Sequence, residues 1–111
     1  GRALRAKEGE RAELIIDAEL ESLAKDQAVR AVGDHVTALR LRGQAQAEQA
    51  LTKALARVRK GEAAEVVMAR LAHELSQKLL HEPSKGLRNV ATHPEQLEVA
   101  LRVLGLNKDD S

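Results

Sequence analysis

Apolar residues recur at steps of three and four along almost the whole chain, and this spacing restricts the possible folds more than any other feature. Ala12, Ile16, Leu20 and Leu23, for example, would lie along one side of a helix. No stretch alternates apolar and polar residues as a half-buried β-strand does. We therefore predict an all-α fold, a helical bundle of about four to five helices with a long N-terminal helix.

The apolar side chains that would fill this bundle are aliphatic. The 111 residues include no Phe, Tyr or Trp, although 43% of them are hydrophobic. Each buried Leu or Ile contributes about 1.5–3 kcal/mol, whereas ordering one residue costs roughly 1.5 kcal/mol. The core is therefore thin for this length, and such a chain often gains further burial from a partner. We expect the bundle to form a dimer.

Composition excludes several classes of protein. The chain has no cysteine, so it holds no disulfide framework, no thiolate nucleophile and no thiolate metal site. No apolar run approaches the roughly 20 residues that a membrane span needs, and no signal peptide is visible. The net charge is +1, which gives no strong overall field. Because Gly1 opens an already charged helical pattern, we interpret the chain as part of a longer protein.

The helical pattern has breaks near its first third and its middle. Gly33 is expected to end a first helix over about residues 3–32, and Asp34 to cap a second helix. That second helix should run from residue 35 to residue 59. Gly61 suits the left-handed position that follows a helix end.

Proline residues mark the later breaks. The third helix is expected over about residues 62–81, because Pro83 disfavours helical geometry in the residue before it. His81 and Pro83 together are the predicted helix stop. A short helical stretch over 84–91 should follow, and Pro94 should then open the last helix.

The apolar stripes supply the candidate packing residues, which would lie in the core or across a dimer. They are Ile16, Leu20, Leu23, Leu51, Leu55, Leu71, Leu75, Leu79, Leu80 and Leu87.

His73 and Glu74 raise the question of a metal-binding helix. A zinc helix needs a second histidine four residues after the first, but Gln77 occupies that position. The next histidine, His81, lies two turns away, and no sulfur ligand is available. We favour a polar surface position for His73 and a helix-capping role for His81, where an imidazolium would interact well with the helix dipole.

Other catalytic patterns are missing. Ser76 falls in the middle of a predicted helix and Ser84 in a turn, so neither has the strained elbow of a nucleophile. No Gly-rich phosphate loop is present. We therefore predict no catalytic, cofactor-binding or metal-binding residue in this chain.

Two groups of basic residues could contact phosphates. They are Lys53, Arg57, Arg59 and Lys60 in one group, and Lys78, Lys85 and Arg88 in the other. There is no aromatic side chain to stack on a base, and acidic residues nearly balance the charge. We favour a solvated face over a nucleic-acid site.

One stretch carries a more specific pattern, close to Leu-x3-Leu-x2-Lys-Leu-Leu-His-x-Pro with Leu-Arg shortly after. The matching residues are Leu71, Leu75, Lys78, Leu79, Leu80, His81, Pro83, Leu87 and Arg88. This stretch resembles the C-terminal dimerisation domain of the glutamyl-tRNA reductase family. In addition, Ala12, Ile15, Ile16 and Glu19 are similar to the end of that family's long spinal helix.

The resemblance implies a single helical dimerisation domain over residues 1–111. Residues 1–32 would end the spinal helix, 34–106 would form the bundle, and 107–111 would be a frayed tail. It also implies a cytoplasmic parent oxidoreductase that uses NADPH to reduce glutamyl-tRNA(Glu) to glutamate-1-semialdehyde for tetrapyrrole (haem) biosynthesis. That family's catalytic cysteine and NADPH site lie in upstream domains, so neither transfers to a residue here. The implied partners are a second copy in a homodimer, those upstream domains and glutamyl-tRNA, with no membrane.

Two other functions remain open from the residues alone. A monomeric helical adaptor would expose an apolar groove. An RNA-binding helical module would act through the two basic groups, with an affinity that falls as salt rises.

Overall fold

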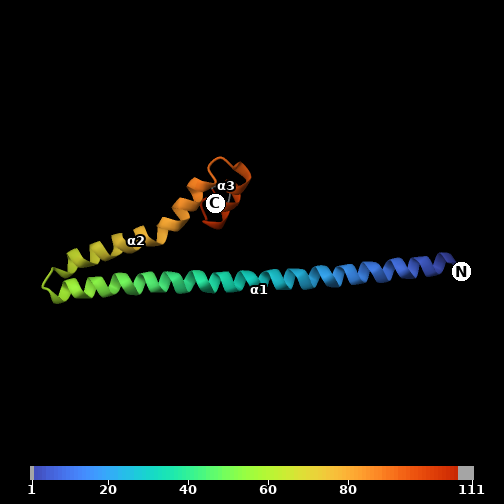
Figure 1. Ribbon diagram of the computed structural model, residues 1–111, viewed down its shortest axis with the longest axis horizontal. Coiled ribbons are helices and arrows are strands. Elements are labelled where there is room, and N and C mark those ends of the chain that lie inside the picture. Colours follow the sequence, from blue (N-terminus) through green and yellow to red (C-terminus); the bar gives the residue numbers. More distant parts are fainter. Residues whose placement is uncertain (1, 108–111) are drawn as a thin grey trace. The chain divides into compact units, whose positions relative to one another are not determined.

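The computed structural model describes residues 2–107, without the side chains of residues 2–4 and 6. Three α-helices and no strand occur in this range: α1 (Arg2–Arg59), α2 (Ala64–Asn89) and α3 (Pro94–Val103), shown in Figure 1. The predicted all-α class is confirmed, with three helices where four to five were expected. The frayed tail was predicted over residues 107–111, and all of it except Asn107 lies outside the described residues.

The chain divides into two compact units within α1. Unit 1 comprises residues 1–41 and unit 2 comprises residues 42–111. Unit 1 is the N-terminal part of α1 alone, whereas unit 2 contains the rest of α1 together with α2 and α3.

The predicted break at Gly33 and Asp34 was wrong, because α1 continues through both residues. A glycine inside a helix costs only about 1 kcal/mol relative to alanine, which the neighbouring helical turns can offset. The backbone oxygen of Gly33 also accepts a 3.1 Å hydrogen bond from the hydroxyl of Thr37, one turn later. Asp34 is therefore an ordinary helical residue and caps nothing.

The predicted break at Gly61 is confirmed. α1 ends at Arg59, and Gly61 adopts a φ of 96°, in the left-handed region that favours glycine. Its amide donates a 3.0 Å hydrogen bond to the backbone oxygen of Val58. The four-residue connection from Lys60 to Ala63 then reverses the chain, so that α2 runs back along the end of α1 (Figure 1).

The predicted helix stop at His81 and Pro83 was also wrong, because α2 passes through both residues and ends at Asn89. Proline removes one backbone donor, at a cost of roughly 3 kcal/mol inside a helix. Pro83 is partly buried here, and it lines an apolar hollow together with Leu87 and with Ala100 of α3. The short helical stretch expected over 84–91 is the last part of α2.

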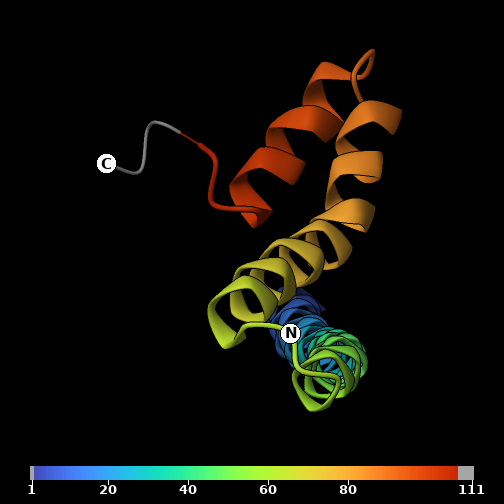
Figure 2. The same cartoon turned by 90° about the vertical axis from the view of Figure 1, so that its left-hand side faces the viewer.

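α3 begins as the sequence predicts. Pro94 occupies its first turn, with His93 at the N-cap position, and Gly105 follows its end with a φ of 71°. α3 lies beside the C-terminal part of α2 in both views (Figures 1 and 2). Its partly buried residues are Leu97, Ala100 and Leu101.

The core of unit 2 lies in the α1–α2 hairpin and is small. Ala50, Ala54 and Val67 are its buried apolar residues, exposing 1%, 4% and 3% of their surfaces. All three have short side chains. The described part of the chain thus shows the thin core that its composition predicts.

Candidate association surface

The hairpin is held by a face of small residues on α1. Its buried or partly buried members are Gly43, Ala47, Ala50 and Ala54. The residues that α2 contributes to the hairpin include Val67, Leu71 and Leu75, and all three are at least partly buried. At Gly43 the approach is close, because a Cβ added there would lie 3.8 Å from Cδ2 of Leu79.

An ion cluster crosses the same hairpin. Nη2 of Arg57 on α1 donates a 3.3 Å hydrogen bond to Oε1 of Glu74 on α2. Nε of Arg70, one turn before Glu74, donates to the same oxygen at 3.2 Å. The side chains of Arg57 and Glu74 are only 21% and 28% exposed, whereas that of Arg70 is 55% exposed. The pair across the hairpin is therefore the less solvated of the two.

These arginines change the acidity of Glu74. The hydrogen bond from Arg57 holds the pKa of the Glu74 carboxyl below its usual value. Partial burial opposes this by disfavouring the charged form, while the charges of Arg57 and Arg70 and the hydrogen bond from Arg70 add to the lowering. Glu74 is therefore a charged structural anchor at neutral pH, with no features of a proton donor.

The sequence did not reveal this pair, since its members are 17 residues apart. Side chains on a helix lean toward the N-terminus of that helix. In the hairpin Arg57 therefore leans away from the connection, whereas Glu74 leans toward it. The two side chains meet because the helices run in opposite directions. The pair can therefore be recognised only once the arrangement of the hairpin is known.

Much of unit 2's apolar surface remains uncovered. On α1, Leu51, Leu55 and Val58 lie along a side of the helix next to the small-residue face, and are 48%, 43% and 44% exposed. Further exposed large apolar residues in unit 2 are Val66, Met68, Leu79, Leu80, Val99, Val103, Leu104 and Leu106. Extensive exposed apolar surface of this kind marks an association site.

Unit 1 carries two apolar stripes on opposite sides of one helix. Ile16, Leu20 and Leu23 form the first stripe, and all three are more than half exposed. Val32 follows Leu23 by about two and a half helical turns, so it faces the other way. The second stripe consists of Val29, Val32, Val36 and Leu39, all exposed. Within unit 1 no second element covers either stripe.

The candidate packing residues thus fall into two groups. Leu71, Leu75 and Leu87 are partly buried within unit 2. The exposed group comprises Ile16, Leu20, Leu23, Leu51, Leu55, Leu79 and Leu80. Of the two residues predicted to stop a helix, His81 is exposed and Pro83 is partly buried.

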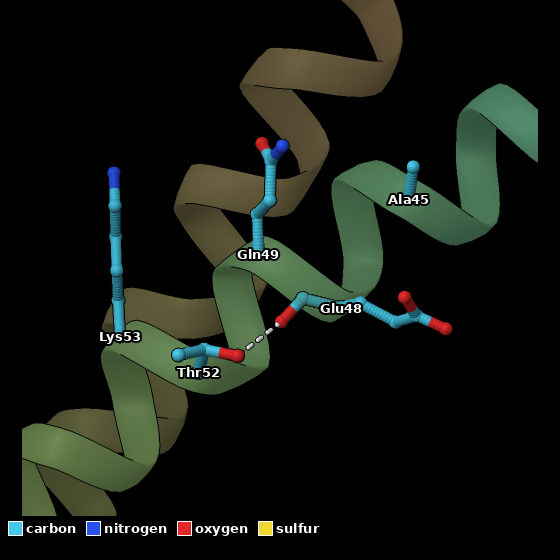
Figure 3. Close-up of a pocket in the computed structure, with 5 residues that line it drawn as sticks. All are labelled: Ala45, Glu48, Gln49, Thr52 and Lys53. Carbon is cyan, nitrogen blue, oxygen red and sulfur yellow. Dashed lines mark hydrogen bonds between the residues drawn. The ribbon is translucent and has the colours of Figure 1, made fainter.

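The described residues hold little that resembles a site for chemistry. They contain no group of three or more His, Cys, Asp or Glu placed to hold a metal ion. One hollow on α1 is lined by Ala45, Glu48, Gln49, Thr52 and Lys53 (Figure 3). All of these residues come from a single helix and are exposed, so they enclose no ligand. Thr52 in this hollow donates its hydroxyl to the backbone oxygen of Glu48 at 2.9 Å.

The first basic group does not act as one surface. Lys53, Arg59 and Lys60 are exposed, whereas Arg57 is turned into the ion cluster. The group therefore presents three exposed basic side chains to solvent instead of four.

A membrane-spanning segment is also missing from the part of the chain that the structure describes. None of its helices combines the length and the apolar character that crossing a membrane requires.

Comparison with known proteins points to one family. Residues 11–106 match the model of the glutamyl-tRNA(Glu) reductase dimerisation domain. A glutamyl-tRNA reductase from Chromohalobacter salexigens is 36% identical over 90 residues, which cover 81% of this chain and 21% of the relative. One from Alkalilimnicola ehrlichii is 40% identical over 88 residues, covering 75% of this chain and 19% of the relative. The comparison with solved structures found no match.

The chain therefore spans about a fifth of the length of these relatives. The matched segment includes residues 11–41 of unit 1 and the whole helical part of unit 2.

Proposed function

Because this chain belongs to the family of glutamyl-tRNA(Glu) reductase dimerisation domains, we propose that it joins two copies of its parent enzyme into a homodimer. The observation that carries this proposal is the uncovered apolar surface of unit 2. Leu51 and Leu55 are more than 40% exposed beside a hairpin core made of two alanines and one valine. Burying a fully exposed leucine contributes about 1.5–3 kcal/mol. Because each of these two is already about half buried, covering the rest would contribute about half of that, and association would thereby complete the core.

The two opposed stripes of unit 1 support the same proposal. A lone helix with apolar residues on opposite sides needs more than one packing partner to cover them. One stripe includes Leu20 and the other includes Val36, and both residues are exposed. Contacts with a second copy and with other domains of the parent would cover these stripes.

For the parent enzyme we propose the activity that the names of its relatives indicate. It is an oxidoreductase that reduces glutamyl-tRNA(Glu) to glutamate-1-semialdehyde with NADPH, in the cytoplasm, at the start of tetrapyrrole biosynthesis. In this proposal the reacting groups and the NADPH site belong to other domains, and this segment contributes the assembly. In this proposal the dimerisation domain holds the two catalytic modules in a fixed, symmetric arrangement.

Association can be tested with two differently tagged copies of the chain. After co-expression at equal levels, purification through one tag should also recover the other copy, at about half the amount of the captured one, because two copies pair at random in a homodimer. Leu51→Asp with Leu55→Asp should reduce this recovery at least tenfold, because a dimer would then bury two unpaired charges. Gln49→Asp is the matched control, since it adds a charge at an exposed polar position of the same helix. Recovery of one tag alone from the unaltered pair would exclude the homodimer.

A further inference from the structure

The apolar packing of the α1–α2 hairpin leaves its register poorly specified. The small face of α1 repeats at steps of four, three and four through Gly43, Ala47, Ala50 and Ala54. Alanine and glycine offer shallow holes that differ little from one turn to the next. A shift of α2 by one turn, about 5.4 Å, would therefore bring a similar set of residues into contact.

The connection between the helices would tolerate such a shift. The N-cap of α2 is Ala63, which makes no side-chain hydrogen bond to the free amides of the first turn. An uncapped first turn is easily unwound. The residues released in this way would lengthen the connection that begins at Lys60.

One polar contact distinguishes the observed register from its neighbours. Among the residues described, the Arg57–Glu74 pair is the ion pair that links α1 to α2. Its atoms meet at 3.3 Å, with both side chains more than two-thirds buried. A shift of one turn would separate them and leave Arg57 partly desolvated without its carboxylate, while Glu74 would keep Arg70 alone. Leaving a partly buried charge without its partner is strongly unfavourable.

The pair is poorly arranged for stability alone. Nη1 of Arg57 is buried and makes no hydrogen bond within the described part of the chain. A buried donor without a partner loses roughly 1–3 kcal/mol of hydration. Apolar residues of similar volume often replace partly buried ion pairs with no loss of stability, whereas the best-attested role of such pairs is to specify register.

We propose that the Arg57–Glu74 ion pair sets the register of the α1–α2 hairpin by penalising packings shifted along α1. This is separate from dimerisation, since both residues lie within unit 2 of one chain. Arg70 is an accessory member: it lies on the same helix as Glu74, and their contact therefore moves with α2 and carries no register information.

The test measures the distance between α1 and α2 in solution. Spin labels are attached at Lys53→Cys and Gln77→Cys, which are exposed positions in a chain that has no other cysteine. Labelled chains are diluted tenfold with unlabelled chains, so that distances between copies do not contribute. The unaltered pair should give one narrow distance distribution by pulsed electron spin resonance.

The decisive variant is Arg57→Met with Glu74→Leu, which replaces the pair with apolar side chains. It should keep the helical content and melting temperature of the parent while gaining a second distance, displaced by a few ångströms and by no more than the roughly 5.4 Å of one helical turn. Arg70→Gln is the matched control and should retain the single distance. One unchanged narrow distance in the apolar variant would overturn the proposal, because side-chain packing alone would then fix the register.

A second pair of variants applies even if the apolar variant does not fold. Arg57→Glu places two carboxylates at the contact and should shift or split the distance distribution. Adding Glu74→Arg restores the attraction with reversed polarity and should return the single parental distance. The same single distance in both variants would overturn the proposal, since register would then be independent of the charges.

Discussion

Gly43 of α1 lies directly against Leu79 of α2: a Cβ added at Gly43 would be 3.8 Å from the Cδ2 atom of Leu79. That separation is an ordinary van der Waals contact, with room for one methyl group and little more. The glycine thus allows close approach of the helices, yet the site would accept the next larger residue. Gly43 also sits inside α1, where glycine has a poor helix propensity.

Gly43→Ala should therefore stabilise the chain by about 0.5–1 kcal/mol, through reduced backbone entropy in the unfolded state. Gly33→Ala is the matched control, since it is also helical and has nothing within 4 Å of an added Cβ. Gly43→Leu should destabilise the hairpin by separating the helices. Chemical denaturation monitored by circular dichroism measures all three, and a loss of stability in Gly43→Ala would contradict the observed packing.

Gly61→Ala should destabilise the hairpin by about 1–2 kcal/mol, because the φ of 96° at this position is strained for a residue with a Cβ. Gly86→Ala is the comparison, as that glycine is helical, in open space, and should gain stability instead. Thermal melting distinguishes the two. Equal effects in the two variants would show that the turn after α1 does not need a left-handed residue.

The lowered pKa of Glu74 makes the hairpin sensitive to acid. A carboxyl with a depressed pKa in the folded state stabilises above its unfolded value of about 4.5, and this contribution is lost as pH falls through the folded value. The melting temperature of the parent should exceed that of Glu74→Gln from about pH 7 to 5. The difference should shrink below about pH 4.5. A difference that stays constant down to pH 3 would mean that the charge of Glu74 contributes nothing.

Two leucines of α2 should respond differently to a buried charge. Leu75 is partly buried in the hairpin, so Leu75→Asp should cost about 3 kcal/mol or more and reduce helical content. Leu80 is 57% exposed and belongs to the uncovered apolar surface of unit 2, so Leu80→Asp should leave the helical content unchanged and, in dilute samples of the single chain, cost no more than about 0.5 kcal/mol. Urea titration gives both values. Similar losses in the two variants would contradict the orientation of α2.

The sequence predicted those features that depend on a few neighbouring residues. The turn at Gly61 and the start of α3 at Pro94 are both set by local backbone chemistry, and both are confirmed. The same kind of rule failed at Gly33 and Pro83, where helices continue. Pro83 is partly buried and lines an apolar hollow with residues of α3, and a local rule contains no information on such tertiary surroundings.

The association surface could be predicted only in part. Periodicity selected apolar positions as candidates for packing, but it could not show that Leu71 would be partly buried within unit 2 while Leu51 stayed exposed. Nor could periodicity show the Arg57–Glu74 pair, because these two residues come together only when α1 and α2 pack in opposite directions. The spacing of apolar residues shows which side of a helix is apolar. It does not show which other helix or chain will cover that side.

The central claim is that this chain associates with a second copy, and the most direct measurement is its mass by sedimentation equilibrium over a range of concentrations. One chain has a mass of 12.1 kDa, and the account predicts a species of twice that mass persisting to low micromolar concentrations. A well-folded helical species of 12.1 kDa at every concentration would contradict it, since the exposed leucines of unit 2 would then need no second copy.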